Sequence, residues 1–384
     1  MQNKIEKDIV IVGAGFAGVC AAVSCARLGR RVTLIEKNSF PGGIPVILQH
    51  RLLCGLYANT LKRPPKFLNK GITPELCRLL APGQKPLRMG RVWVLPFSPA
   101  RLAGILIGFL KREKDIEVMY DTEFESCLCE NNNITAVMLK LRNRRVTLSP
   151  GMVIDAGAGS VVQQAGAALA LESSEKLQLA GYTILVGGAS FNQELAIRVP
   201  YCLRQAVREG LFERHAQFTF LYPGIKESEV YIKYALPVNT DIFAAKRLAS
   251  AVLRFLKQEI ADFKRSRVLW QARQVCSRDC ARLAGKYVMK GRDVLLGRKF
   301  SDTVISGAWP VEFWDKAGGP RYSYVTNGYY QVPLGALRAK RIKNLFACGR
   351  STAADGVSAA SLRAGGMCMA TGQAAGLAAV GQRA

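Results

Sequence analysis

Histidine is scarce in this sequence, which has only His50 and His215 among its 384 residues. A zinc or iron–sulfur site needs several histidine or cysteine ligands at suitable spacing. The eleven cysteines are an odd number and are scattered along the chain. We interpret them as small, mainly buried apolar residues in a reducing compartment. We therefore expect no metal site.

Long apolar runs are also missing. The stretch LAGILIGFL at residues 102–110 is among the longest, whereas a membrane-spanning helix needs about 20 apolar residues. The opening MQNKIEKDIV mixes charges of both signs and lacks the apolar core of a secretion signal. These features predict a cytoplasmic protein without a transmembrane segment. The length predicts two domains, or one large domain with an insertion.

Acidic residues are few, since 28 Asp and Glu stand against 54 Lys and Arg, and the formal net charge is +26. Residues 246–299 hold 15 basic residues and four acidic ones. Such an excess attracts nucleic acids, acidic proteins, anionic membranes or anionic substrates. A solvated basic surface without a specific partner is equally compatible with this composition.

The strongest motif is GAGFAG, which follows the apolar run DIVIV and precedes a helix-like segment and a second strand. Gly13 permits a tight turn, Gly15 lets the backbone approach a pyrophosphate, and Gly18 lets the helix and strand pack closely. Glu36 ends the second strand, where a carboxylate accepts hydrogen bonds from an adenosine ribose and repels a 2′-phosphate. This unit predicts a bound dinucleotide but does not separate NAD from FAD.

The remaining chain alternates between strand-like and helix-like segments. Residues 99–114 have helical periodicity, and three strand-like segments follow, the first over residues 116–130. With a hairpin turn at residues 130–133, they predict a β-meander. From about residue 181 to 331 strands are mixed with one long helix, predicted from the apolar stripe Leu248, Val252, Leu256, Ile260 and Phe263. A second strand–GxGxxG–helix unit is absent, so no separate nicotinamide site is expected.

The C-terminal segment carries a longer signature. It contains Gly349-Arg350, then Ser361-Leu362-Arg363, then the run CMATGQ at residues 368–373. Together with the glycine motif and the strand MVIDAGAG, it resembles the FAD-dependent oxidoreductase family of the glutathione-reductase-like, two-dinucleotide-binding-domain flavoprotein class. The resemblance implies an α/β fold with a Rossmann-like FAD-binding domain, a β-meander and a mixed α+β substrate domain. The FAD-binding domain is expected at residues 1–50, 98–180 and 335–384, and the substrate or cap domain at residues 51–97 and 181–334.

The resemblance also implies which residues contact FAD. The glycine turn would face the pyrophosphate, the second strand and the meander would hold the adenosine, and the C-terminal signature would approach the ribityl chain and pyrimidine ring. The implied set is Gly13, Gly15, Phe16, Ala17, Gly18, Glu36, Lys37, Gly42, Gly43, Phe124, Asp155, Ala156, Gly157, Gly349, Arg350, Ser361 and Leu362.

Four residues are candidates for the substrate side. The resemblance suggests Arg282 and Tyr330, which lie in segments that are near the flavin in the family. His50 and Cys54 follow the Gly42-Gly43 turn, and they are candidates for a proton acceptor and a nucleophile or redox partner. The alternatives stay open: a packing histidine, a core thiol and a structural ion pair. The chain also departs from the family, which often has a histidine at the position of Trp314.

Three functions follow from these signals. The first is an FAD-dependent oxidoreductase, either a dehydrogenase or an oxidase. It would move a hydride between a polar small-molecule substrate, anionic substrates included, and flavin N5. Its electron acceptor is unidentified. The second is a flavoprotein that acts on a macromolecular or carrier-bound substrate, a nucleic acid or an acidic protein partner, through its basic surface. The third is an FAD-binding interaction protein without turnover.

Overall fold

The computed structural model describes residues 5–59, 65–170 and 177–381. Its main sheet has the strand order β6-β2-β1-β9-β8-β7, with β18 beside β9. The strands are β1 (Ile5–Val12), β2 (Val32–Ile35), β6 (Ile116–Met119), β7 (Thr122–Glu130), β8 (Asn133–Leu141), β9 (Arg144–Asp155) and β18 (Leu345–Ala347). The strands β6, β2, β1, β9 and β18 pair with one another in parallel. The predicted α/β class, with a Rossmann-like sheet built from discontinuous segments, is confirmed.

The β-meander consists of β7, β8 and the first half of β9, paired antiparallel. Its first turn places Asn131 and Asn132 at φ values of 50° and 62°, which asparagine tolerates better than most residues. The single strand predicted over residues 116–130 is wrong in one respect. Asp121 has a φ of 49°, and this left-handed residue divides the segment into β6, in the parallel part, and β7, in the meander.

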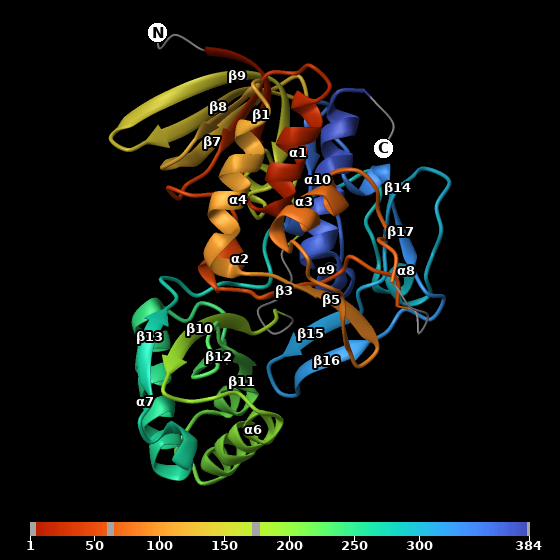
Figure 1. Ribbon diagram of the computed structural model, residues 1–384. Coiled ribbons are helices and arrows are strands. Elements are labelled where there is room, and N and C mark those ends of the chain that lie inside the picture. The colour runs from red at the N-terminus through yellow and green to blue at the C-terminus, as the bar shows by residue number, and fades with distance from the viewer. Residues whose placement is uncertain (1–4, 60–64, 171–176, 382–384) are drawn as a thin grey trace.

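One face of the main sheet is covered by the helices α1 (Phe16–Ala26), α3 (Ile72–Leu80), α4 (Pro99–Lys111) and α10 (Gly365–Ala379) (Figure 1). Ile9 and Ile11 of β1 share the hydrophobic core of these helices, whereas Val10 and Val12 belong to the core on the opposite face. Small residues allow α10 to approach α1 closely. A Cβ atom added at Gly372 would lie 2.1 Å from the carbonyl oxygen of Ala17.

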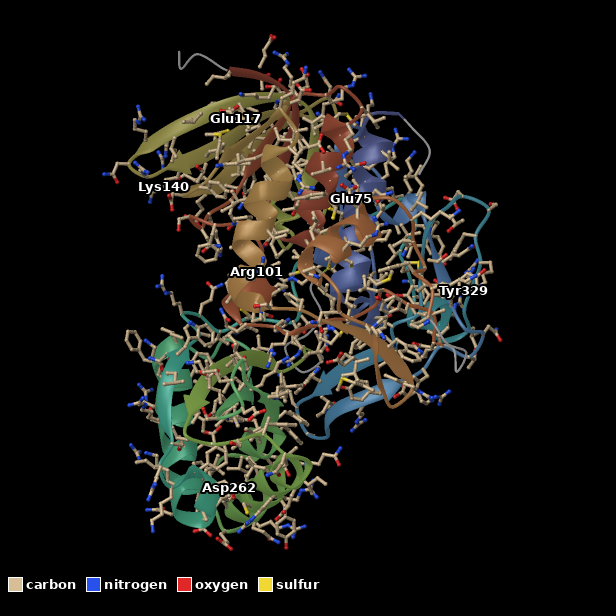
Figure 2. The ribbon with its side chains drawn as sticks, in the orientation of Figure 1. Glu75, Arg101, Glu117, Lys140, Asp262 and Tyr329 are labelled. Carbon is tan, nitrogen blue, oxygen red and sulfur yellow. The ribbon has the colours of Figure 1, made fainter. Side chains whose placement is uncertain are left out.

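A second sheet has the strand order β11-β12-β10-β13 and its own hydrophobic core. It contains β10 (Ala180–Gly187), β11 (Phe220–Pro223), β12 (Glu229–Leu236) and β13 (Arg267–Gln271), and the helices α6 (Gln193–Arg208) and α7 (Ile242–Glu259) pack on it. Figure 1 shows this unit below the main sheet. In Figure 2, Asp262 of this unit lies at the opposite end of the molecule from Lys140 of the meander.

The long helix predicted from the apolar stripe is shorter than expected. Helix α7 ends at Glu259, and Ile260 has an extended φ of −131°. A 3₁₀ turn, η3 (Ala261–Phe263), then folds the chain back. Both Ile260 and Phe263 are fully buried, because the turn returns their side chains to the same core.

Three short sheets are also present. They comprise β3 (Leu52–Leu53) with β4 (Leu87–Met89) and β5 (Val92–Pro96), β14 (Thr303–Gly307) with β17 (Tyr330–Pro333), and β15 (Val311–Asp315) with β16 (Gly319–Ser323). The remaining elements are α2 (Ile44–Ile47), α5 (Ser160–Gln164), α8 (Gly291–Leu295), α9 (Gly356–Leu362), η2 (Arg214–Phe218), η4 (Leu334–Ala336) and η5 (Gly349–Ser351). Within the described ranges, none of the helices combines the length and apolar character that crossing a bilayer requires. The domain boundaries stay a prediction.

Candidate functional site

A cavity of about 940 Å³ extends from the ends of β1 and β2 to the second sheet. Its walls come from the glycine turn before α1, the loop around α2, the end of β9, strands β11, β12, β15 and β16, and the α9–α10 connection. Figure 1 shows α2 where the main sheet and its helices meet the second sheet, with β15 and β16 beside it. The cavity therefore joins segments that are far apart in the sequence.

The glycine turn forms one end of this cavity. Gly13, Gly15, Phe16 and Ala17 line it, where α1 begins without a side-chain cap. Gly13 has a φ of +97°, and a Cβ atom there would lie 2.7 Å from the carbonyl oxygen of Ala156. A Cβ atom on Gly15 would meet nothing within 4 Å. This open position next to the first N–H groups of a helix suits an anionic group such as a pyrophosphate.

Gly18 has a packing role, because it does not line the cavity. A Cβ atom at this position would lie 1.8 Å from the carbonyl oxygen of Gly13. Glycine is thus required for the helix to start so close to the end of β1.

Glu36 lies at the same end and is 5% exposed. Its Oε1 accepts hydrogen bonds from the backbone N–H and side-chain amide of Asn38 at 2.9 and 2.6 Å, and its Oε2 accepts one from the N–H of Ala14 at 2.9 Å. A carboxylate oxygen has two lone pairs, so Oε2 retains one for a ribose hydroxyl. Lys37 and Phe124 line the cavity beside it.

Six more of the predicted cofactor residues line the cavity: Gly42, Gly43, Ala156, Gly157, Gly349 and Arg350. Asp155 lies behind them and is fully buried. Its carboxylate accepts hydrogen bonds from the N–H groups of Gly157 and Val162, each at 2.9 Å. Burial raises the pKa of Asp155 although these hydrogen bonds oppose the rise. Asp155 therefore holds the turn that follows β9.

Besides Gly18 and Asp155, four more predicted residues lie away from the cavity wall. Ser361 and Leu362 are buried in the core, and the Ser361 hydroxyl donates a hydrogen bond to the carbonyl oxygen of Trp309. Tyr330 is fully buried, with its hydroxyl 2.7 Å from that of Ser361. Arg282 donates from Nε to the carbonyl oxygen of Ala354 at 2.7 Å. These four side chains pack against protein groups, and their contact with a ligand stays a prediction.

The opposite end of the cavity contains His50 and Cys54 together with a charged group that the sequence did not reveal. We call this group the cation cluster, and define it as Lys233 of β12, Arg278 of the segment after β13, and Arg363 after α9. One carboxylate, Glu312 of β15, lies beside it. The hydroxyls of Tyr222 and Tyr322 complete this wall, and burial raises the pKa of both.

The three cations are close enough to influence one another. Burial and the neighbouring Arg363 lower the pKa of Arg278 to about 9, so its guanidinium stays charged at neutral pH. Burial and Arg278 lower the pKa of Lys233 to about 8. The guanidinium carbon of Arg278 lies 3.8 Å from the ring centroid of Trp314, and Nζ of Lys233 lies 5.8 Å from it. Both cations thus have a cation–π contact with the same ring, and the negative charge of Glu312 also favours the charged form of each.

Glu312 is held by two tryptophans. Nε1 of Trp314 donates to Oε1 at 2.8 Å, and Nε1 of Trp309 donates to Oε2 at 3.2 Å. Burial alone would raise the pKa of Glu312, but Arg363 and the Trp314 hydrogen bond outweigh it and hold this pKa below its usual range. The carboxylate is therefore ionised at neutral pH. Arg363 donates to the backbone oxygen of Glu312 at 2.7 Å.

His50 has a buried Nε2 atom for which the part of the chain that the structure describes offers no hydrogen-bond partner. Burial and the charges of the cation cluster lower the pKa of His50 well below its usual value. The ring is therefore neutral and has an unused nitrogen in the cavity wall. Burial and Glu312 raise the pKa of the Cys54 thiol to about 12, which keeps it protonated and a poor nucleophile.

Two of the four charged residues that the sequence analysis missed, Lys233 and Arg363, do have a signal in the sequence. Lys233 interrupts the apolar strand EVYIKYAL, and a lysine within a buried strand is unusual without a polar role. Arg363 belongs to the Ser-Leu-Arg run of the C-terminal signature. No comparable local signal marks Arg278 or Glu312. Among the described residues, no group of three or more His, Cys, Asp or Glu side chains has the arrangement of a metal site.

Comparison with known families gives one match over nearly the whole chain. Residues 8–382 match the family described as FAD dependent oxidoreductase. This span includes both ends of the cavity.

Individual relatives are more distant. The chain is 31% identical over 196 residues to a probable electron transfer flavoprotein-quinone oxidoreductase of Escherichia coli (strain K12), covering 45% of this chain and 43% of that protein. It is 43% identical over 42 residues to a phytoene desaturase of Fusarium fujikuroi, covering 11% of this chain and 7% of the desaturase. The chain thus aligns with less than half the length of these curated relatives.

Solved structures share the fold at low sequence identity. A geranylgeranyl bacteriochlorophyll reductase-like protein from Thermoplasma acidophilum has a TM-score of 0.51 and 12% identity, over 98% of this chain and 78% of that one. The aromatic hydroxylase CabE of angucycline biosynthesis has a TM-score of 0.52 and 12% identity, over 98% of this chain and 63% of that one. These similarities concern the fold.

Proposed function

The chain belongs to the FAD-dependent oxidoreductase family, and on that premise we propose that it moves a hydride between a small anionic organic molecule and flavin N5. It would act as a dehydrogenase or an oxidase. The observation that supports this most directly is the shared cavity, lined at one end by the glycine turn and Glu36 and at the other by the cation cluster. A cofactor and an anionic substrate can meet there.

The dinucleotide end suits the ADP part of FAD. The free N–H groups at the start of α1 would face the pyrophosphate, and Oε2 of Glu36 would accept a hydrogen bond from the ribose. Lys37 and Phe124 would flank the adenine. The bound flavin supplies a two-electron acceptor that takes up hydride. We also propose the glutathione-reductase-like arrangement, with the FAD-binding and cap domains divided as the sequence predicts.

The opposite end would bind and orient the substrate. The cation cluster would hold its acid group through charge-assisted hydrogen bonds. Oxidation of a carbon that bears an O–H or N–H group releases a hydride from carbon and a proton from the heteroatom. Nε2 of His50 would accept that proton, since it is unpartnered and neutral.

This location favours a small substrate over a nucleic acid or an acidic protein. The residues of the cation cluster line an internal cavity. A polyanion would instead need a row of basic residues along an exposed surface. The electrons must then leave to an acceptor. By analogy with the Escherichia coli relative, we propose a separate electron-transfer protein or a quinone as that acceptor, and a cytoplasmic site of action.

The test is anaerobic screening of the FAD-loaded protein with organic acids that carry an α-hydroxyl or α-amino group. An anionic substrate should bleach the visible flavin band, and its neutral amide should not do so at the same concentration. The His50→Gln variant should retain the flavin band and bleach much more slowly. Bleaching that is equally fast with the acid and the amide would contradict an anionic substrate.

A further inference from the structure

The charges at the substrate end of the cavity do not balance. Lys233, Arg278 and Arg363 contribute three positive charges, and Glu312 contributes one negative charge. Among the described residues, the other carboxylates that line the cavity are Glu36 and Glu123, at the dinucleotide end. A surplus of two positive charges therefore remains beside His50.

Glu312 does not neutralise the cations by direct pairing. Its two carboxylate oxygens are occupied by the indole N–H groups of Trp309 and Trp314. Arg363 contacts the backbone oxygen of Glu312 instead of the carboxylate. The carboxylate thus acts as a fixed charge within the wall, and the donors of the cations stay available.

Within the described residues, several of these donors have no protein partner. Nε of Arg363 is buried there without a hydrogen bond, while Nη2 also reaches Oε1 of Gln178 at 3.4 Å. Arg278 donates from Nη1 to the carbonyl oxygen of Leu179 and lies over the ring of Trp314. Lys233 has that same ring as its neighbour. Buried guanidinium and ammonium groups are unfavourable unless an anion satisfies them.

From this imbalance we infer that the substrate of the proposed oxidoreductase carries two negative charges close together, as in a dicarboxylate or a phosphomonoester. This inference rests on the proposed function, since it names the substrate class of the same site. One negative charge would leave a buried cation without a counter-charge. Two charges pair with the surplus, and the oxygen atoms of the dianion accept the free N–H groups.

Arg51 also lines this end of the cavity, and one nitrogen of its guanidinium is engaged. Nη1 of Arg51 donates to the carbonyl oxygens of Pro223 and Gly224. It therefore helps to hold the loop after β11, and because carbonyl oxygens are neutral its charge adds to the surplus, which is at least two.

The experiment uses the FAD-loaded protein and anions that do not react. Malonate, succinate, inorganic phosphate and acetate are titrated at constant ionic strength near neutral pH, with the visible flavin spectrum and the melting temperature as readouts. We expect at least one dianion to bind about tenfold or more tightly than acetate, because each additional charge-assisted contact strengthens binding. Tighter binding of malonate or succinate indicates a dicarboxylate, and tighter binding of phosphate indicates a phosphomonoester.

Two variants locate the effect. Lys233→Met removes one charge of the cluster. Among the described residues, Lys233 makes no hydrogen bond that this substitution would break. The preference for dianions should fall about tenfold. Arg254→Met removes the same charge from the exposed surface of α7 and should leave the preference unchanged. Equal affinity for acetate and all dianions, or an equal loss in both variants, would overturn the inference.

Failure of the inference is distinguishable from failure of the proposed function. A protein that retains FAD and is bleached by a monoanionic substrate, but shows no preference for dianions, overturns the inference alone. A protein that takes up no FAD contradicts the proposed function itself.

Discussion

The guanidinium of Arg278 stacks on Trp314, with its central carbon 3.8 Å from the ring centroid. The same ring donates its N–H to the Glu312 carboxylate. Trp314 thus holds a cation and an anion of the cavity wall in fixed positions. A tryptophan side chain takes up no proton, so this position of the wall adds fixed contacts and no titratable group.

Trp314→Phe should separate these two contacts. The ring remains available to Arg278, but Glu312 loses its shorter hydrogen bond. The pKa of Glu312 should rise, because hydrogen bonds to a carboxylate favour its charged form. The acid limb of the kcat/KM profile should move to higher pH. The control Trp270→Phe, on β13 outside the cavity, should leave the limb in place; an unchanged limb in Trp314→Phe would contradict the role of this hydrogen bond.

His50→Gln should lower kcat by about 10²-fold to 10⁴-fold, the usual contribution of a positioned proton acceptor. The flavin spectrum and the melting temperature should change little. His215→Gln is the matched control, because His215 pairs with Glu213 and does not line the cavity. Similar kcat values for the two variants would exclude His50 as the proton acceptor.

Binding of an anion should depend on the protonation of Lys233. Its pKa of about 8 results from burial and Arg278, with Glu312 opposing and Arg363 adding to the effect. Cys54, Tyr222 and His50 also face this region, and each is neutral near pH 8, because burial holds the pKa values of Cys54 and Tyr222 high and that of His50 low.

Lys233 is charged below its pKa and neutral above it, so affinity for an anionic substrate should fall as pH rises through about 8. The dissociation constant measured from pH 6 to pH 10 should show this limb in the native protein, followed by a second limb near pH 9 as Arg278 loses its charge. Only the limb near pH 8 should be absent in Lys233→Met. A limb near pH 8 that persists in this variant would assign the titration to another group.

Gly372→Ala should destabilise the protein. The added Cβ atom would lie 2.1 Å from the carbonyl oxygen of Ala17, so α10 must move away from α1 at a cost of about 1–3 kcal/mol. Gly104→Ala is the control, since Gly104 is exposed on α4 with nothing within 4 Å of the new atom. It should stabilise by about 1 kcal/mol or less. Chemical unfolding measures both changes, and equal stabilities would contradict the tight packing of α1 and α10.

The dinucleotide end of the site was predictable because its signals are local. A glycine turn between a strand and a helix, with Glu36 after the next strand, fixes the geometry within one βαβ unit. The division between β6 and β7 was missed because the alternation of apolar and polar residues does not reveal that the backbone of Asp121 is left-handed. The end of α7 was missed because Ile260 and Phe263 continue the helical spacing although a 3₁₀ turn delivers them to the core.

The substrate end was harder to predict because it depends on tertiary structure. Lys233, Arg278, Glu312 and Arg363 come from different parts of the chain, and only the tertiary fold brings them to one cavity. Arg282 is only four residues after Arg278, yet it faces Ala354 rather than the cavity. Membership of a motif near the flavin therefore did not determine the direction in which a side chain points.

The most direct test of the account is the visible absorbance spectrum of the purified protein before and after acid denaturation. The account predicts a flavin band in the native protein, and release of FAD into solution when the chain unfolds, because the residues around the glycine turn hold the cofactor only in the folded state. A colourless protein that also fails to take up added FAD would contradict the account.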